Sequence, residues 1–380
     1  MGKHRAATAL SLTALAVAVL GQTPLGHAAV STVRVALFAQ NSGRVNNIQA
    51  SRTPVPGRLL ALDSKGRFPS SVLRRTDENY THTIIVHPHP DLAKAGTALR
   101  NAIDGITDNS ATNPYLVKIE PGVYDLGSLN VAMKPYVDIE GSGELVTTVT
   151  SANSTGSGTI VGADNSELRS VTVKNNGNGQ AVALWAESTS PRFTHVTAIS
   201  SGNIESYGVH LSNGSTVLKD VTARATGGTT AMGLANFNGN TTATNSSFSA
   251  ADASGLVVGV LTTFGGSVRL TSSNLSASGG AIAIGMRSYN GSHSLANVTV
   301  GASGTGQSYG IYSGQKTSAP SVQVNQSRVS GQTNSVFVLG GPVRLGASQL
   351  TGPVATQDLG TIACAASYDG SFSPLGAACS

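Results

Sequence analysis

From Leu168 to the end of the chain, one short pattern recurs about every 25 residues. The apolar residue that opens each copy recurs at Leu168, Phe193, Leu218, Ala243, Leu270, Leu295, Val324 and Leu345, at intervals of 25, 25, 25, 27, 25, 29 and 21 residues. A unit this short cannot bury its own apolar face, so successive copies must stack and share one core. The repeat therefore predicts a solenoid.

Each copy contains two strand-like segments joined by Gly- and Asn-rich turns, in which positive φ costs glycine little. In the first copy, alternation places Leu168, Val171 and Val173 on or near the interior. Trp185 lies in an apolar segment and is also expected in the core, and Tyr207 and Tyr309 are expected at equivalent stacked positions. Parallel strands joined in this way favour a right-handed connection. We therefore expect an all-β fold, a right-handed single-stranded parallel β-helix.

One segment before the repeats has helical rather than strand periodicity. Leu99, Ala102, Ile103 and Ile106 fall on one face of a helix near 95–108. A solenoid leaves an open apolar end that invites edge pairing. We expect this helix to cap the N-terminal end of the stack.

The N-terminus has the features of an export signal. Basic residues 3–5 precede an apolar run, and small residues end it near Ala28, which predicts a signal peptide at 1–28. No later stretch holds eighteen uninterrupted apolar residues, so we expect no transmembrane segment. We expect a protein that is secreted or held on the cell surface.

Charge is distributed unevenly along the chain, whose net charge is +5. Residues 34–75 contain eight Arg and Lys against a single acidic residue, Asp63. We assign 29–80 to a basic N-terminal arm or tether, which suits contact with an anionic cell-wall polymer. The predicted solenoid then covers 81–360.

Composition and cysteine content limit the remaining options. Only 11% of the chain is charged and 5% aromatic, with 45 glycines, which argues against an ordinary helical or α/β enzyme. The two cysteines, Cys364 and Cys379, are expected to pair in an exported chain and to close a C-terminal tail at 361–380.

The segment before the repeats also carries a family resemblance. A helix, then VKIEPGVYDLG (117–127), YVDIEGSG (136–143) and TTVTS (147–151), resembles the opening coils of pectin-lyase-like right-handed parallel β-helix proteins, particularly pectinesterases. The resemblance covers 95–151 and implies the fold. Pectinesterases carry a catalytic aspartate in a Gly-x-x-Asp-Phe-x-Phe-Gly segment, and the nearest match, at 334–340, has no Asp. The catalytic motifs of that family are therefore missing.

The repeat length predicts which polar residues become neighbours. Residues one coil apart lie about 4.8 Å apart, so one column should contain Ser170, His195, Asp220, Asn245, Ser272, Asn297 and Gln326. The first three have the residue types of a nucleophilic triad. The rest continue as a file of turn-stabilising polar residues, and this interpretation of the whole column is favoured over catalysis.

The weak catalytic candidates are His195 and Asp220, together with Glu187 and Glu205, two acids that loops could bring together at the spacing of a glycosidase pair. His82, His87, His89 and Asp91 have metal-ligand residue types, but the prolines among them place these side chains in a surface loop. We expect no metal and no cofactor. The absence of a phosphate loop and of a basic-aromatic stripe also argues against nucleic acid as a partner.

The favoured function is an exported, non-catalytic structural or adhesive protein of the surface or extracellular space that contacts polysaccharide. The alternative is a divergent polysaccharide lyase or carbohydrate esterase acting on acidic or acetylated glycans. The sequence leaves open whether the solenoid is a monomer or a fibre-like trimer.

Overall fold

The computed structural model describes residues 44–45, 48–51, 59–60, 80–315 and 319–380. The chain forms two compact units, 1–78 and 79–380. In the first unit, β1 (Arg44–Val45) pairs antiparallel with β2 (Ile48–Ser51), which pairs parallel with β3 (Leu59–Leu60). The predicted signal peptide and most of the basic arm lie outside the described residues.

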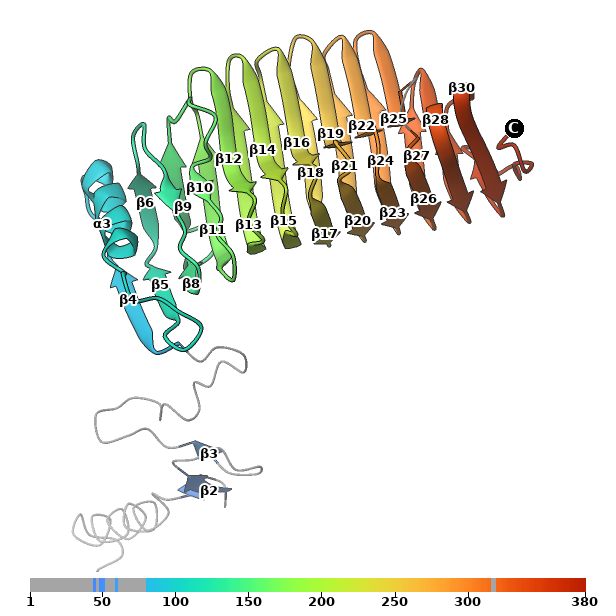
Figure 1. The fold of residues 1–380 in the computed structure, drawn as a ribbon. Helices are drawn as coiled ribbons and strands as arrows, with labels where there is room; N and C mark the ends of the chain where they lie inside the picture. Colours follow the sequence, from blue (N-terminus) through green and yellow to red (C-terminus); the bar gives the residue numbers. More distant parts are fainter. Residues whose placement is uncertain (1–43, 46–47, 52–58, 61–79, 316–318) are drawn as a thin grey trace, which may run out of the picture. The chain divides into compact units, whose positions relative to one another are not determined.

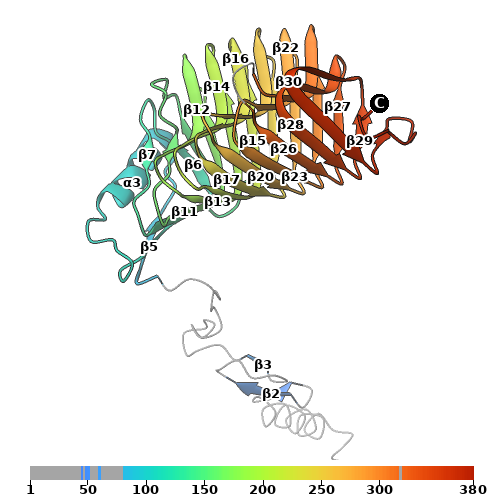
Figure 2. The same cartoon turned by 45° about the vertical axis from the view of Figure 1, so that its right-hand side comes forward.

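The second unit is a solenoid in which parallel strands coil around one core (Figures 1 and 2). Each regular coil contributes to three sheet faces. The first face contains β7 (Val131–Ala132), β10 (Ile160–Val161), β12 (Gln180–Glu187), β14 (Glu205–Ser212), β16 (Thr230–Phe237), β19 (Leu256–Thr263), β22 (Ile282–Ser288), β25 (Gln307–Ser313), β28 (Asn334–Gly346) and β30 (Val354–Ala365).

The second and third faces follow along each coil. The second face contains β4 (His82–Val86), β5 (Tyr115–Ile119), β8 (Val137–Glu140), β11 (Glu167–Asn175), β13 (Arg192–Ser201), β15 (Val217–Thr226), β17 (Asn240–Thr244), β20 (Ser267–Thr271), β23 (Ser292–Ala296) and β26 (Ser321–Asn325), and then the later parts of β28 and β30. The third face contains β6 (Gly122–Asp125), β9 (Thr147–Ser151), the later parts of β11, β13 and β15, and then β18 (Ser247–Ala251), β21 (Asn274–Ser278), β24 (Thr299–Ser303), β27 (Arg328–Gly331), β29 (Gln349–Thr351) and β31 (Tyr368–Asp369).

The strand register confirms that one repeat makes one coil. Leu168 pairs with Phe193, and Phe193 pairs with Leu218. Leu168, Val171 and Val173 are fully buried in the core, as expected. Leu168 and Val171 are three residues apart and still share the interior, because the left-handed residue Ser170 turns the chain between them. Two residues that are one repeat apart in the sequence are therefore neighbours on adjacent coils of the solenoid.

The second and third faces meet at a corner made by one residue in each coil. The residues at this corner have φ between 47° and 55°, in the left-handed region, and they are Ser170, His195, Asp220, Asn245, Ser272, Asn297, Gln326, Ala347 and Ala366. The polar column predicted from the repeat is therefore the corner itself. His, Asn and Asp tolerate this conformation better than most other non-glycine residues.

A ladder of buried serines supports the inner side of this corner, one residue further along the chain. The hydroxyl of Ser327 accepts from the backbone N–H of Val298 at 3.0 Å and donates to the carbonyl of Asn325 at 2.7 Å. The same arrangement recurs at Ser246, Ser273, Ser348 and Ser367. Serine replaces valine here because its hydroxyl satisfies backbone groups at the corner that a methyl group cannot.

The first face carries a local irregularity that controls which side chains point outward. In each strand one residue forms no ladder pair, and this position holds Ala183, Gly208, Gly233, Gly259, Gly285 and Gly310. A Cβ on Gly233 would lie 2.7 Å from the backbone nitrogen of Ser249 across the interior. The residues on either side of this position, Val182 and Trp185, belong to or pack against a separate apolar cluster outside the core. The prediction that Trp185 is a core residue is therefore wrong.

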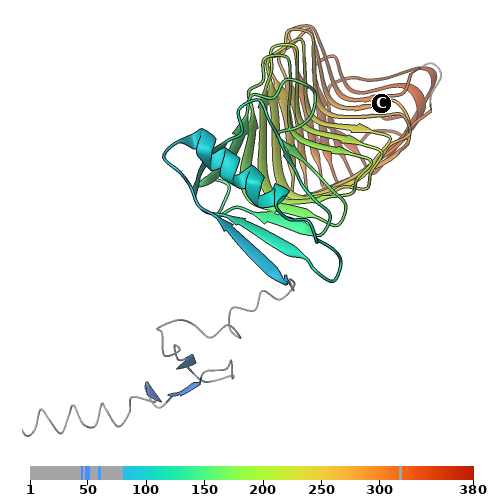
Figure 3. The ribbon, with the colours of Figure 1, turned by 60° about the vertical axis from the view of Figure 1, so that its left-hand side comes forward.

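The one helix in the described part of the chain, α3 (Leu92–Asp104), lies beside the first coils and packs mainly on β6 (Figure 3). It buries Leu99 and Ile103. It begins earlier than expected because the Asp91 carboxylate accepts from the backbone N–H groups of Ala93 and Lys94. It also ends sooner, at Asp104. That this helix caps the stack remains a prediction.

The predicted disulfide is confirmed: Cys364 and Cys379 are bonded, with their Cα atoms 5.1 Å apart. The last coil runs further than residue 360, because β30 continues to Ala365 and β31 still pairs with β29. Within the described residues, no helix is long and apolar enough to span a bilayer.

Candidate functional site

The structure places the triad-like residues at three successive corners. The Nε2 atom of His195 lies 3.6 Å from Asp220 Oδ2, which is longer than a normal hydrogen bond. The His195 side chain is 56% exposed and that of Asp220 is 27% exposed. Because each side chain leaves the corner from the same left-handed backbone position, Ser170, His195 and Asp220 form a straight file. A nucleophilic triad instead needs groups that converge on one reacting atom.

The two glutamates considered as an acid pair lie at opposite ends of the first face. Glu205 opens β14 and pairs in register with Gln180, the first residue of β12, whereas Glu187 is the last residue of β12. Seven residues of extended strand separate the two positions, which corresponds to about 23 Å. Loops therefore do not bring Glu187 and Glu205 together. Glu205 instead accepts hydrogen bonds from Gln180 Nε2 at 2.9 Å and from the Tyr207 hydroxyl at 3.2 Å.

The His-rich loop uses its polar groups locally. His87 Nδ1 lies 2.9 Å from Glu120, and His89 Nδ1 accepts from the backbone N–H of Asp91 at 2.9 Å. His82 stacks on Tyr115 with ring centroids 4.6 Å apart. Among the described residues, no three His, Cys, Asp or Glu side chains converge as metal ligands.

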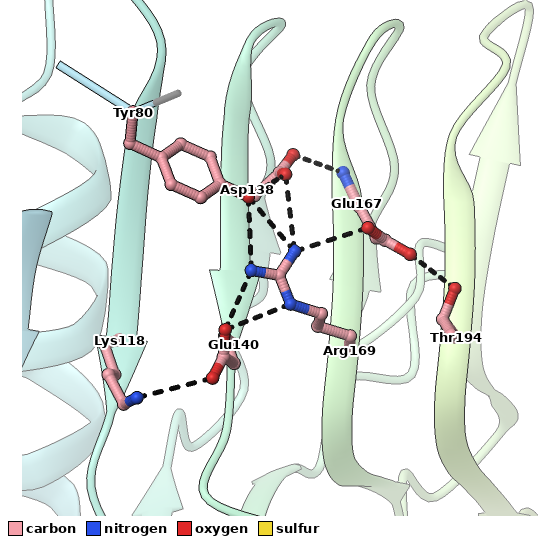
Figure 4. Close-up of polar contacts among 7 residues, drawn as sticks. All are labelled: Tyr80, Lys118, Asp138, Glu140, Glu167, Arg169 and Thr194. Carbon is pink, nitrogen blue, oxygen red and sulfur yellow. Dashed lines mark hydrogen bonds and ion pairs between the residues drawn. The ribbon is translucent and has the colours of Figure 1, made fainter. Parts of the chain in front are cut away.

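A buried charged network crosses the second face in the opening coils (Figure 4). At its centre, Arg169 donates from Nε and Nη2 to Glu140 Oε2 at 3.0 and 2.8 Å. Its Nη1 atom lies 3.5 Å from Asp138 and 3.3 Å from Glu167. Arg169 is 9% and Glu140 6% exposed. The second cation, Lys118, lies 3.4 Å from Glu140.

Tyr80 fastens the start of the solenoid to this charged network. Its hydroxyl donates to Asp138 Oδ2 at 2.5 Å and accepts from Arg169 Nη1 at 3.1 Å. Burial, followed by the hydrogen bond to Asp138, raises the pKa of Tyr80. Burial also raises the pKa of Asp138, although Tyr80, the Glu167 N–H and Arg169 oppose that shift. Each charge of the group faces an opposite charge, so the network is suited to holding the first coils together.

The first face also carries an outward row of mostly apolar side chains, which we call the aromatic row; one of its two columns is buried, and the other is partly exposed at its rings and at Arg287. One of its columns contains Val182, Tyr207, Met232, Val258, Ile284 and Tyr309. The other contains Trp185, His210, Ala235, Leu261, Arg287, Tyr312 and Phe337. Tyr207 and Tyr309 share one column, as expected. Leu184 and Ala186 lie in the core, so alternation directs Trp185 between them to the outside.

Rings stack on one another at the N-terminal end of the row. Trp185 and His210 are nearly coplanar, with centroids 3.9 Å apart and an interplanar angle of 2°. Phe237 stacks on the other side of His210 at 4.7 Å, and Phe264, 70% exposed, lies beyond it. Burial lowers the pKa of His210 to about 4, which keeps the ring neutral at pH 7.

The C-terminal end of the row holds its one cation. The Arg287 guanidinium carbon lies 4.5 Å from the Tyr289 ring centroid and 5.5 Å from that of Tyr312. Tyr312 in turn packs on Tyr309 and Phe337. The Nε atom of Arg287 is buried without a hydrogen-bond partner among the described residues, and no described carboxylate forms an ion pair with the guanidinium. The row therefore combines stacked, partly buried rings with a guanidinium that forms no ion pair with a described carboxylate.

No protein-family model and no curated protein sequence matches this chain. Solved structures do match. The Dettilon tailspike protein gp208 superposes with a TM-score of 0.54 at 9% identity, over 75% of this chain and 62% of its own. The chain therefore spans less than two thirds of that tailspike protein.

Enzymes also appear among the similar structures. Pectin methylesterase PemA from Erwinia chrysanthemi matches with a TM-score of 0.40 at 12% identity, over 77% of this chain and 90% of its own. The catalytic domain of a GH87 alpha-1,3-glucanase matches with a TM-score of 0.36 at 12% identity, over 75% and 68%. The chain has a pectin-lyase-like parallel β-helix fold. Likeness at these identities establishes architecture and no activity.

The sequence reasoning missed both the charged network and the outward position of the aromatic row. Glu140 and Arg169 pair across an interval of 29 residues, which departs from the 25-residue spacing. Tyr80 and Arg169 are 89 residues apart in the chain. A search for acids and bases near Arg169 at offsets other than 25 would have found Glu140.

Proposed function

We propose that this protein is an exported, non-catalytic protein of the cell surface or extracellular space that binds an acidic polysaccharide along the aromatic row. The observation that carries the proposal is the outward row of stacked rings with Arg287 unpaired at one end. Aromatic faces bind the apolar faces of sugar rings, and a guanidinium binds a carboxylate or sulfate in bidentate fashion.

The dimensions of the row support an extended ligand. From Trp185 to Phe337 the column crosses six strand spacings, or about 29 Å. The rings are fixed by mutual contact, so little side-chain entropy is lost when a ligand binds. A polymer could therefore lie along the stack and place one acidic group on Arg287.

The absence of convergent acids along the row supports a binding role over catalysis. The alternating columns of the row contain no Asp or Glu, and Glu205 at the edge is engaged by Gln180 and Tyr207. A lyase or esterase needs a base or nucleophile within reach of the bound sugar.

Titration calorimetry with polygalacturonate and with its fully methyl-esterified form tests the proposal. We expect Arg287→Gln to weaken polygalacturonate binding by about tenfold and Trp185→Ala to weaken both forms, because the ring contact does not depend on charge. Arg269→Gln, an exposed arginine on the second face, is the matched control. Equal binding by the wild type and both row variants would contradict a site at this row.

Catalysis is tested on the same polymers by measuring reducing ends, unsaturated products and released methanol or acetate. We expect none above background, and Asp220→Asn should leave that background unchanged. Product formation abolished by Asp220→Asn would replace this proposal with the enzyme alternative.

Export and domain organisation form a further part of the proposal. We propose a signal peptide at 1–28, a basic arm at 29–80 and helix α3 as the N-terminal cap of the solenoid. Burial of Leu99 and Ile103 supports the cap, and the disulfide is consistent with an oxidising compartment. N-terminal sequencing of the secreted protein should find Ala29, and sedimentation equilibrium distinguishes a monomer from a fibre-like trimer.

A further inference from the structure

A polar groove runs along the corner between the second and third faces, away from the aromatic row. It consists of two hollows of about 400 and 460 Å³ that share Asn297 and Thr299. One is lined by Thr222, Asn245, Ser246, Ser247, Ser272, Ser273, Asn274, Asn297 and Thr299, and the other by Asn297, Val298, Thr299, Gln326, Ser327, Arg328, Ala347, Gln349 and Tyr368. We call this the corner groove.

The polar side chains of the groove are not needed to make the corner. Ala347 and Ala366 adopt the same left-handed conformation, with φ of 47° and 50°, without any polar side chain. The buried serine ladder already satisfies the backbone behind the corner. The amides at Asn245 and Gln326 therefore remain available for another task.

The side-chain amides along the corner groove are available to bind a ligand. The side chains of Asn245, Asn274 and Gln326 are exposed and form no hydrogen bond with another described residue. Asn297 makes a single contact, donating to Ser272 Oγ at 3.2 Å. Each free amide offers two donors and an acceptor. Along the corner column, Asn297 and Gln326 lie one coil apart, about 4.8 Å, whereas Asn245 lies two coils from Asn297 with Ser272 between them.

An exposed aromatic pair marks the C-terminal end of the groove. Tyr368 lines the hollow and stacks on Phe372, with centroids 5.2 Å apart and an interplanar angle of 18°. Phe372 is 68% exposed and has φ of 64°, an uncommon conformation for a bulky residue. Asp369 holds this turn by accepting from the N–H groups of Ser371 and Ser373. The pair forms a platform on which a sugar ring can stack.

The chemistry of the groove selects its ligand. The lining contains hydroxyls and amides, one cation, Arg328, and no carboxylate. A nucleic acid would require several cations along its phosphates. An extended peptide adds to a sheet along a free strand edge, but this groove crosses strands that already pair on both sides. A neutral chain rich in hydroxyl groups fits this lining.

We infer that the corner groove is a second binding site, which takes a neutral linear polysaccharide, with its hydroxyls on the amide column and one sugar stacked at Tyr368 and Phe372. From Thr222 to Tyr368 the groove crosses six strand spacings, or about 29 Å. The inference concerns a different face from the aromatic row and stands whether or not that row binds acidic glycans.

Affinity electrophoresis through gels containing hydroxyethylcellulose, arabinoxylan, galactomannan or a soluble β-1,3-glucan tests the site. We expect at least one of these neutral polymers to retard the wild type. The double variant Asn297→Ala/Gln326→Ala should bind that polymer about tenfold more weakly, and so should Phe372→Ala. Because alanine already occupies two corners, the double variant should still fold, with a melting temperature only slightly below that of the wild type.

Two controls separate this site from the aromatic row. Asn213→Ala removes an exposed left-handed asparagine from a turn at the end of the first face and should leave retardation unchanged. Trp185→Ala should also leave it unchanged. The inference is overturned if none of the four polymers retards the wild type, or if the corner variants bind like the wild type.

Discussion

The opening coils and the regular coils of this solenoid are held together by different means. Up to β11, a helix packs on the third face and a buried network of Arg169 with three acids crosses the second face. From β13 onward, apolar columns stack at nearly constant intervals, and from Ser246 a serine joins most corners to the next. Regular spacing lets one small interaction recur in each coil, whereas the irregular opening coils are stabilised by contacts found only there, namely the helix and the charged network.

The largest expected effect comes from removing the central cation of the charged network in the opening coils. Arg169→Met should lower the free energy of unfolding of this region by about 3–5 kcal/mol, because it leaves buried acids without their cation. The matched substitution in the regular coils, Arg269→Met, removes an exposed arginine of the same face and should change stability by less than about 0.5 kcal/mol. Urea unfolding followed by hydrogen exchange measures both. Equal small effects would remove the contrast between the two regions.

Acid should affect the regular coils most through two buried histidines. Burial lowers the pKa of both His210 and His293 to about 4, and His293 is fixed by Asn290 O at 2.9 Å. Their unfolded pKa is about 6.5, so this stability is complete above pH 6.5 and is lost as pH falls towards 4, by about 3 kcal/mol for each histidine. The raised pKa of Asp138 acts in the opposite direction in the opening coils.

Hydrogen exchange at pH 7 and pH 4.5 should therefore show protection falling first around β20 to β23, where His293 packs. Introducing His293→Gln should reduce the dependence on pH in that segment. Loss of protection beginning instead at β5 and β8 would reverse the assignment.

A smaller effect tests the serine ladder. Ser327→Ala leaves the Val298 N–H without its acceptor and should cost about 1–3 kcal/mol. Ser276→Ala, which removes a partly exposed hydroxyl on β21, is the control and should be nearly neutral. Thermal melting of the two variants at pH 7 is sufficient, and equal melting temperatures would show that the ladder does not stabilise the corner.

The smallest effect tests the start of α3. Asp91→Ala removes the acceptor for two N–H groups and should cost about 1 kcal/mol. Asp104→Ala, at the far end of the helix and part of an exposed pair with Arg100, should cost less than about 0.5 kcal/mol. A larger loss for Asp104→Ala in chemical denaturation would indicate that the helix is held at its C-terminal end instead.

Periodicity made the regular coils predictable because one quantity, the repeat length, determines which residues of successive coils pair. The 25-residue offset correctly placed His195 beside Asp220. Tyr207 and Tyr309 share a column as expected, because each stands before a glycine and an apolar residue in its copy. The same rule failed where coil length changes, so the Glu140–Arg169 contact was missed. Trp185 was assigned to the core because its segment is apolar, but this strand has apolar side chains on both sides: Leu184 lies in the core and Val182 in the outer cluster. Ala183 also points inward and shifts the alternation within the strand. Such a shift depends on how close the backbone of the third face lies across the interior, and the sequence does not show that distance.

Each coil has three turns between its faces. The corner between the second and third faces always contains one residue, whereas the two turns that border the first face vary in length. Where intervals lengthen to 27 or 29 residues, the strands flanking the corner keep their register, and the extra residues fall in the other turns. New loops can therefore be grafted at the borders of the first face without changing the spacing of the amides along the corner. The corner keeps a constant spacing while the two turns that border the first face accept insertions, which makes the solenoid a suitable scaffold for displaying binding loops at fixed intervals.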